Sequence, residues 1–112
     1  MAAEKTFENK IKQFLKDNDC WYVKYFANSF TKSGIPDILA CVNGYFVAIE
    51  VKAPNGRPSE LQKWNRDQIQ FSRGIALILY PKDFEIFKRL VTSLLNNDYP
   101  RAVILAQTIN ER

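Results

Sequence analysis

The dipeptide Asn43-Gly44 is the feature that most constrains how this chain folds. It lies between two apolar runs, Pro36 to Val42 and Tyr45 to Lys52. Asn-Gly between apolar runs of strand length predicts a β-hairpin with a two-residue type I′ turn. Such a turn fixes the register, so Val42 lies opposite Tyr45 and every later pair of opposed residues also has numbers that sum to 87.

This register places Asp37 directly opposite Glu50, on the same face of the hairpin. The β-carbons of opposed residues lie about 4.5–5.5 Å apart. Side chains alternate along a strand, so Lys52 shares the face of Glu50 while Ile49 and Val51 point to the other face. Two carboxylates and a lysine are therefore expected to converge.

Two opposed carboxylates destabilise a strand pair, and partial burial increases the cost. Lys52 offsets part of the negative charge of Asp37 and Glu50, and a divalent cation would balance the rest. Because the ligands are oxygens, we expect Mg²⁺ or Mn²⁺. Taken singly, Asp37 also fits a turn residue after Pro36, and Lys52 also fits the polar end of a strand. Their convergence with Glu50 favours the metal site.

A first helix is predicted from about Glu4 to Asp19, because apolar residues recur there with helical spacing. Glu8 lies at the edge of this apolar stripe, where it is able to face inward. If the helix packs over the hairpin, Glu8 reaches the metal directly or through water. The alternative is a solvent-facing glutamate in the first turn, which the helix dipole also favours.

The other elements follow from periodicity and from helix and strand breakers. The expected segments are a strand over 21–26, a loop over 27–34, a second helix over 59–72, a strand over 75–80 and a third helix from about 83. The expected inner stripe of the second helix is Leu61, Trp64, Gln68 and Phe71. The apolar patch from Ala102 to Ala106 fits a last strand or a dimer contact, and both alternatives stay open.

Composition limits the possible chemistry. The chain of 112 residues, long enough for a single domain over 1–112, has no histidine and two cysteines, Cys20 and Cys41. Histidine-dependent nucleophilic triads are therefore excluded, and the usual zinc sites are disfavoured. A net charge of +4 and a pI near 9.1 favour polyanionic partners. No apolar run is long enough for a bilayer and no signal peptide is apparent, so we expect a cytoplasmic protein.

The chain resembles a nuclease superfamily in two short motifs. Gly34-Ile35-Pro36-Asp37 and Glu50-Val51-Lys52 are similar to the PD-(D/E)XK pattern. The continuation from Ala53 to Trp64 resembles the VRR-NUC family within that superfamily, with Pro58 where the family often has leucine. The resemblance implies an α/β restriction-endonuclease-like core of order α-β-β-β-α-β, here followed by a further helix. Short stand-alone domains of this kind are typical of bacteriophages and prophages, which implies a phage or bacterial source and, for a phage protein, the host cytoplasm.

The resemblance also implies roles for individual residues. Asp37, Glu50 and the carbonyl of Val51 would be metal ligands, and Lys52 would orient or activate the attacking water. Glu8 would be the helix-borne acidic residue found in Holliday-junction-resolvase-like relatives. Gln62 would support the site. Ser59 and Gln62 also have the spacing of a capping box, a structural role that is compatible with the catalytic one.

We therefore expect a Mg²⁺- or Mn²⁺-dependent endonuclease that hydrolyses DNA phosphodiester bonds, including branched or Holliday-junction-like DNA, without an organic cofactor. A domain with one site cuts one strand per binding event, which favours a homodimer on duplex DNA. The expected phosphate contacts are Lys24, Lys32, Arg57, Lys63 and Arg66, although each taken singly also fits a solvated surface residue. The alternatives are a non-catalytic nucleic-acid-binding module and a protein-interaction domain built around Trp21 to Phe30.

Overall fold

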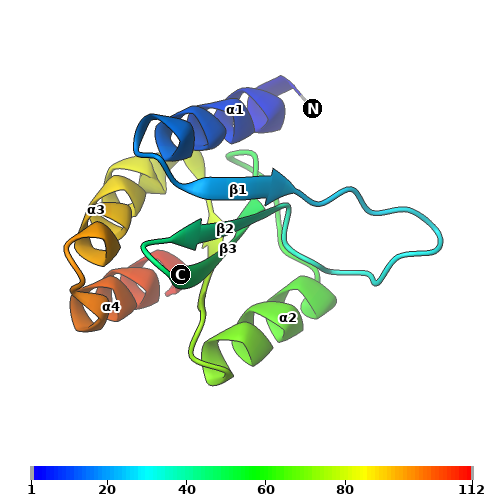
Figure 1. Cartoon of the computed structure of the whole chain (residues 1–112). Coiled ribbons are helices and arrows are strands. Elements are labelled where there is room, and N and C mark those ends of the chain that lie inside the picture. Colours follow the sequence, from blue (N-terminus) through cyan, green and yellow to red (C-terminus); the bar gives the residue numbers. More distant parts are fainter. Residues whose placement is uncertain (1, 112) are drawn as a thin grey trace.

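A computed structural model describes residues 2–111 of the chain. The α/β fold has a mixed four-stranded sheet in the order β1-β2-β3-β4, in which β3 and β4 are parallel and the other neighbours are antiparallel (Figure 1). The elements are α1 (Ala2–Asp17), β1 (Trp21–Lys24), β2 (Ile38–Val42), β3 (Tyr45–Val51), α2 (Glu60–Phe71), β4 (Ile75–Leu79), the 3₁₀ turn η1 (Pro81–Asp83), α3 (Phe84–Leu95) and α4 (Tyr99–Asn110).

The predicted hairpin is confirmed with its register. Val42 pairs with Tyr45, and Ile38 pairs with Ile49 at the far end of the ladder. Asn43 and Gly44 have φ values of 51° and 85°, as a type I′ turn requires. The Asn43 side chain donates to the carbonyl of Leu94 at 2.9 Å, which ties the turn to the end of α3.

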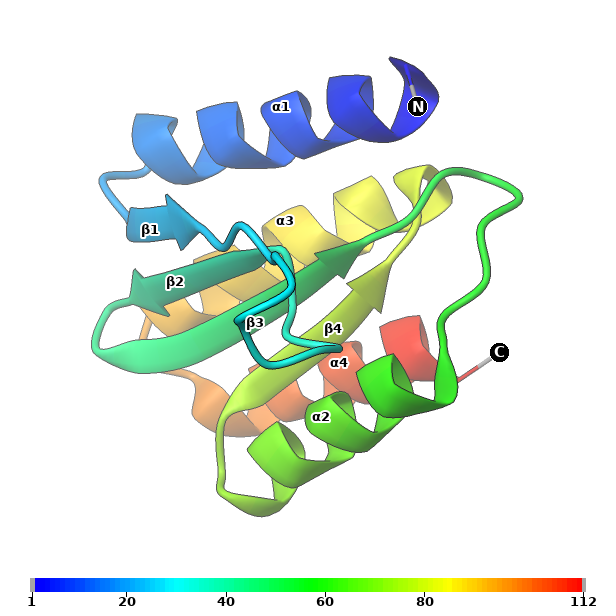
Figure 2. The same ribbon diagram turned by 90° about the vertical axis from the view of Figure 1, so that its right-hand side faces the viewer.

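The two faces of the sheet are covered by different helices. Figures 1 and 2 show α3 and α4 on one face, α1 above the β1 side of the sheet, and α2 on the opposite face. The main buried cluster joins alternate residues of the strands, including Ile49 and Val51, to apolar side chains of α1, α3 and α4. Edge-to-face contacts of Phe7 and Phe14 with Phe84 hold α1 against α3. This face supplies the main core, and the α2 face carries Glu50 beside buried apolar residues.

The predicted inner stripe of α2 is wrong. Leu61, Trp64 and Phe71 are 44%, 52% and 86% exposed, whereas Asn65 is buried and Gln62 and Ile69 are half-buried. The helix covers β3 and β4 where the sheet carries Glu50, so it presents polar side chains there rather than its largest apolar ones. Hydrogen bonds from Gln62 to Glu50 and from Gln70 to the carbonyl of Ala76 accompany this orientation, and apolar periodicity alone does not reveal them.

The possible last strand over residues 102–106 is not formed, because residues 99–110 form α4. Asp98 caps this helix by accepting from the N–H of Arg101, and Pro100 lies in its first turn. Ala102 and Ala106 are buried inside the single chain, which does not support a dimer contact through them. The Asn110 side chain accepts from the N–H of Ile78 and donates to the carbonyl of Ala76, so an amide satisfies backbone groups on the outer edge of β4.

Smaller differences concern the ends of elements. The first helix spans residues 2–17 rather than 4–19, and β1 ends at Lys24 rather than at Phe26. The loop between β1 and β2 projects beyond the strand ends (Figure 1). Within residues 2–111, no helix combines the length and the apolar character needed to cross a bilayer.

Gly34 closes this loop against α2 and should not tolerate a side chain. Its φ is +75°, and a β-carbon there would lie 2.7 Å from Leu61 Cγ and 2.9 Å from Asn65 Nδ2. We expect Gly34→Ala to lower the free energy of unfolding by roughly 2–4 kcal/mol, because left-handed strain and a steric clash add. Urea denaturation measures the change.

Gly44→Ala is the matched control, since Gly44 has a φ of +85° and a β-carbon there would meet nothing within 4 Å. It should cost only the backbone strain, roughly 1–2 kcal/mol. Equal losses in the two variants would show that the contact between Gly34 and α2 does not constrain the loop.

Candidate active site

Asp37 and Glu50 meet where the hairpin register predicts. Asp37 directly precedes β2, and its Oδ2 accepts a hydrogen bond of 2.8 Å from the N–H of Val51. Lys52 follows the end of β3, and its Nζ lies 3.6 Å from Glu50 Oε2. The side chains of Glu50 and Lys52 are 8% and 13% exposed. The predicted convergence of these three residues is therefore present in the structure.

The negative charge of Glu50 is unfavourable because this carboxylate is buried beside that of Asp37. Its Oε2 accepts from Gln62 Nε2 at 2.9 Å, while its Oε1 is buried without a hydrogen-bond partner among residues 2–111. Burial, followed by the negative charge of Asp37, raises the pKa of Glu50 to about 8 against the opposing effect of Lys52. A buried oxygen without a partner beside a second carboxylate is a position that a cation would stabilise.

Gln62 forms the capping box expected from the sequence and also contacts Glu50, as a supporting role in the site would require. Its backbone N–H donates to Ser59 Oγ, and its side-chain Oε1 accepts from the N–H of Ser59, which completes the capping box. The Nε2 of the same side chain holds Glu50 Oε2. The start of α2 is thus joined to the carboxylate on β3 by one amide, and its two functions do not compete.

Glu8 faces inward, but its partners are lysines. Its carboxylate lies 2.9 Å from Lys24 Nζ, 3.1 Å from Lys12 Nζ and 3.4 Å from Lys5 Nζ. Burial alone would raise the pKa of Glu8, but the hydrogen bonds and charges of Lys24 and Lys12 lower it to about 2. Lys24 Nζ also lies 3.5 Å from Asp37 Oδ1, so this ammonium group links Glu8 to the site.

The same ammonium group is stabilised in its charged form. Burial would lower the pKa of Lys24, yet Glu8 and Asp37 raise it above the ordinary value. Within residues 2–111, no three Asp, Glu, His or Cys side chains come together in a way that could hold a metal ion. Glu8 is therefore not assembled with Asp37 and Glu50 as a third carboxylate ligand in this structure.

The remaining candidate ligand is the backbone carbonyl of Val51. The N–H of Val51 points toward Asp37, whereas the N–H of Lys52 donates to Leu79 on the opposite side of β3. In an extended strand the N–H and C=O of one residue project to the same edge. The carbonyl of Val51 thus lies on the side of Asp37. Two carboxylates and one carbonyl suit Mg²⁺, which keeps several waters and takes few protein ligands.

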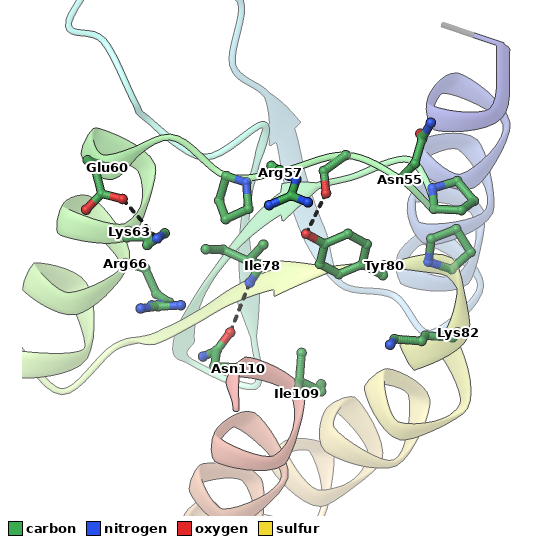
Figure 3. Close-up of a pocket in the computed structure, with 14 residues that line it drawn as sticks. Asn55, Arg57, Glu60, Lys63, Arg66, Ile78, Tyr80, Lys82, Ile109 and Asn110 are labelled. Carbon is green, nitrogen blue, oxygen red and sulfur yellow. Dashed lines mark hydrogen bonds and ion pairs between the residues drawn. The ribbon is translucent and has the colours of Figure 1, made fainter. Parts of the chain in front are cut away.

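The expected phosphate-binding residues do not form a single surface. Lys24 is engaged with Glu8 and Asp37, and Lys32 is exposed in the loop between β1 and β2. The other three, Arg57, Lys63 and Arg66, line a groove beside the loop 53–58 (Figure 3). Lys82 also lines this groove, although the sequence did not single it out. Its position after β4, next to Pro81, is a signal that could have placed it at this end of the sheet.

Comparisons with protein-family models, with curated proteins and with solved structures found no match to this chain.

Neutralising Glu8 should destabilise the fold. We expect Glu8→Gln to lower the free energy of unfolding at pH 7 by roughly 1–3 kcal/mol, because three ammonium groups lose their shared carboxylate. The pKa of Glu8 is lowered in the folded state, so the difference between wild type and variant should be complete above about pH 4.5 and decline as the pH falls toward 2.

Urea denaturation between about pH 2.5 and 7 tests this expectation. Glu85→Gln is the control, because Glu85 also pairs with a lysine on a helix but is 77% exposed. It should change stability by less than about 0.5 kcal/mol. A pH-independent loss in Glu8→Gln would contradict the electrostatic explanation.

Neutralising Glu50 should have the opposite effect. The pKa of Glu50 is raised to about 8 in the folded state, so the native protein loses stability as the pH rises from about 4.5 to 8. In EDTA, Glu50→Gln should remove this loss and exceed wild type by roughly 1–4 kcal/mol at pH 8. The gain should vanish near pH 4.5. Glu60→Gln, at a side chain that is 91% exposed, is the control.

Proposed function

We propose that this protein is a metal-dependent endonuclease that hydrolyses DNA phosphodiester bonds at Asp37, Glu50 and Lys52. The observation that carries the proposal is the meeting of two carboxylates beside a lysine, with one carboxylate oxygen of Glu50 buried and unpartnered within residues 2–111. A purely structural pair would be expected to have its buried oxygens satisfied. The fold keeps an unfavourable arrangement at a place where a cation would relieve it.

The residues present fit a hard divalent cation. Asp37 and Glu50 would hold Mg²⁺ or Mn²⁺ together with the carbonyl of Val51, and water and a substrate phosphate would complete the ligand set. When bound, the metal would polarise the phosphoryl oxygen and lower the pKa of a bound water, which makes histidine unnecessary. This suits a chain that contains no histidine.

The residues around the two carboxylates have distinct tasks in this proposal. The ammonium group of Lys52 lies 3.6 Å from Glu50. There it would orient the attacking water and stabilise the negative charge that develops on the phosphoryl group. Gln62 fixes the rotamer of Glu50 through a 2.9 Å hydrogen bond. Lys24 balances Asp37 from the other side and is itself held by Glu8. Glu8 is then a positioning residue.

In this proposal the substrate is DNA and the protein acts as a homodimer. The resemblance of 34–37 and 50–64 to VRR-NUC nucleases favours DNA, including branched or Holliday-junction-like forms, and a phage or bacterial origin. One site per chain favours two copies acting on the two strands of a duplex. A host or bacterial cytoplasm is the compartment that this origin would imply.

A non-catalytic nucleic-acid-binding module is the second candidate, favoured by the basic groove next to the site. Such a module would need the groove but would gain nothing from a buried, unpartnered carboxylate oxygen. It predicts binding of nucleic acid with no cleavage in any divalent cation. The two candidates are therefore separated by a cleavage assay.

The assay uses supercoiled plasmid and a synthetic four-way junction, each with Mg²⁺, Mn²⁺ or EDTA. Wild type should cut in the presence of metal and be inactive in EDTA. Lys52→Ala and Asp37→Asn should each lower the single-turnover rate by at least about 100-fold, because each removes a group that touches the reacting atoms or the metal. Binding in Ca²⁺ should persist in Lys52→Ala.

Lys16→Ala is the matched control for charge, since Lys16 is an exposed residue in the last turn of α1. It should keep the wild-type rate within about twofold. A wild type that cuts neither DNA in Mg²⁺ or Mn²⁺ would overturn the proposal, as would cleavage that Lys52→Ala and Asp37→Asn leave intact.

A further inference from the structure

A basic groove of about 1100 Å³ lies beside the candidate active site. Figure 3 shows Lys63 and Arg66 of α2 on one side, Lys82 on the other and Arg57 between them. The accessible apolar part of the lining comes from prolines and from Tyr80, while Ile78 and Ile109 lie buried at its base. The groove is larger than the roughly 300–1,000 Å³ typical of small-molecule pockets. It therefore combines a cationic rim with apolar surface.

The groove and the site are neighbours on one face of the sheet. Ile78 of β4 pairs with Glu50 of β3, so a groove residue lies directly beside the carboxylate across the parallel ladder. Lys52 Cδ lies 3.4 Å from the position of a β-carbon on Gly56, which belongs to the groove. Tyr80 donates from its hydroxyl to the carbonyl of Gly56 at 2.8 Å and holds this loop in place. The loop 53–58 thus separates the site from the groove.

Some of the positive charges in the groove have an ion-pair partner among residues 2–111, and others have none. Lys63 pairs with Glu60 at 2.9 Å, and Arg66 pairs with Asp67 at 3.0 Å, so these two cations are partly balanced. Arg57 and Lys82 are exposed and make no ion pair with any residue of 2–111. Among the described residues, Glu60 is the one carboxylate residue in the lining. The groove thus carries an excess of positive charge that faces solvent.

We propose that this groove binds a single-stranded segment of the nucleic acid adjoining the phosphodiester that is cut, an inference that rests on the proposed nuclease function. Phosphates would lie against Arg57 and Lys82, and exposed bases would cover the partly exposed prolines and Tyr80 of the lining. A duplex keeps its bases stacked inside and presents mainly phosphates, so it would leave the apolar lining uncovered. The substrate class is therefore DNA with an unpaired segment next to the cleavage point.

The test measures binding by fluorescence anisotropy in Ca²⁺ or EDTA, with a labelled single strand and a blunt duplex of the same sequence. Arg57→Gln/Lys82→Gln should raise the Kd for the single strand at least about tenfold. The salt dependence of binding should weaken by about 0.7 in log–log slope for each phosphate that the variant no longer neutralises. The Kd for the duplex should change less than that for the single strand.

Arg101→Gln/Lys16→Gln is the matched control, with the same residue types and the same change of charge. Both residues are exposed, and neither lines the groove. This control should stay within about twofold of wild type on both DNAs, and thermal melting should show that both double variants are folded. Equal losses in the two double variants, or an equal loss on duplex and single strand, would overturn the proposal.

Cleavage of a flapped substrate in Mg²⁺, measured over a range of protein concentrations, separates this inference from the nuclease proposal. The groove variant should need at least about tenfold more protein than wild type for half-maximal cleavage, whereas the control variant should match wild type. If wild type cleaves and the groove and control variants bind DNA equally well, the groove proposal is overturned and the nuclease proposal stands. If wild type never cleaves but its binding of the single strand depends on the groove residues, the nuclease proposal is overturned and the groove remains a binding site.

Discussion

The register of the β2–β3 hairpin is the constraint on which the rest of the structure depends. A two-residue turn at Asn43-Gly44 leaves no freedom in which residues oppose each other, and the contact of Asn43 with Leu94 anchors the turn to α3. Ile49 and Val51 are thereby directed into the core while Glu50 is directed to the α2 face. A slip of one residue would bury Glu50 in the core and expose both neighbours, so the same apolar burial that stabilises the sheet also brings the carboxylates together.

The electrostatic cost of this arrangement is distributed over several elements. Lys52 from the end of β3 and Lys24 from β1 each lie within 3.6 Å of one of the two carboxylates. Lys24 is in turn held by Glu8, whose carboxylate is shared with Lys5 and Lys12. Asp37 has the additional support of a backbone N–H, whereas Glu50 keeps one oxygen without a partner among residues 2–111. The compensation is thus nearly complete for Asp37 and incomplete for Glu50.

Much of this could be predicted from the sequence because it depends on local rules. The Asn-Gly turn fixes a register, the register fixes which side chains meet, and Ser59 with Gln62 fixes the start of α2.

The errors arise where contacts with distant parts of the chain determine the structure of a segment. Leu61 and Trp64 have the spacing of a core stripe, yet α2 turns Gln62 and Asn65 inward, and Gln62 binds the carboxylate of Glu50 on the sheet. By composition, an apolar stretch such as 102–106 fits either a strand or a helix. The helix is stabilised by the cap at Asp98 and by the hydrogen bonds of Asn110 to β4. Glu8 faces inward, as its place on the first helix predicts. Its partner Lys24, however, lies on β1, and residue spacing within the helix cannot predict the position of that strand.

Helix α2 connects these observations. Gln62 reaches Glu50 from its first turn, while the next residue, Lys63, and Arg66 one turn later point to the groove. The loop that leads into the helix starts at Lys52 and contains Pro54 and Pro58, which restrict its backbone. It is also held at Gly56 by the hydroxyl of Tyr80. A displacement of α2 would therefore move the support of Glu50 and the wall of the groove together, so the alignment of the site with its neighbouring surface is built into one short helix and the loop before it.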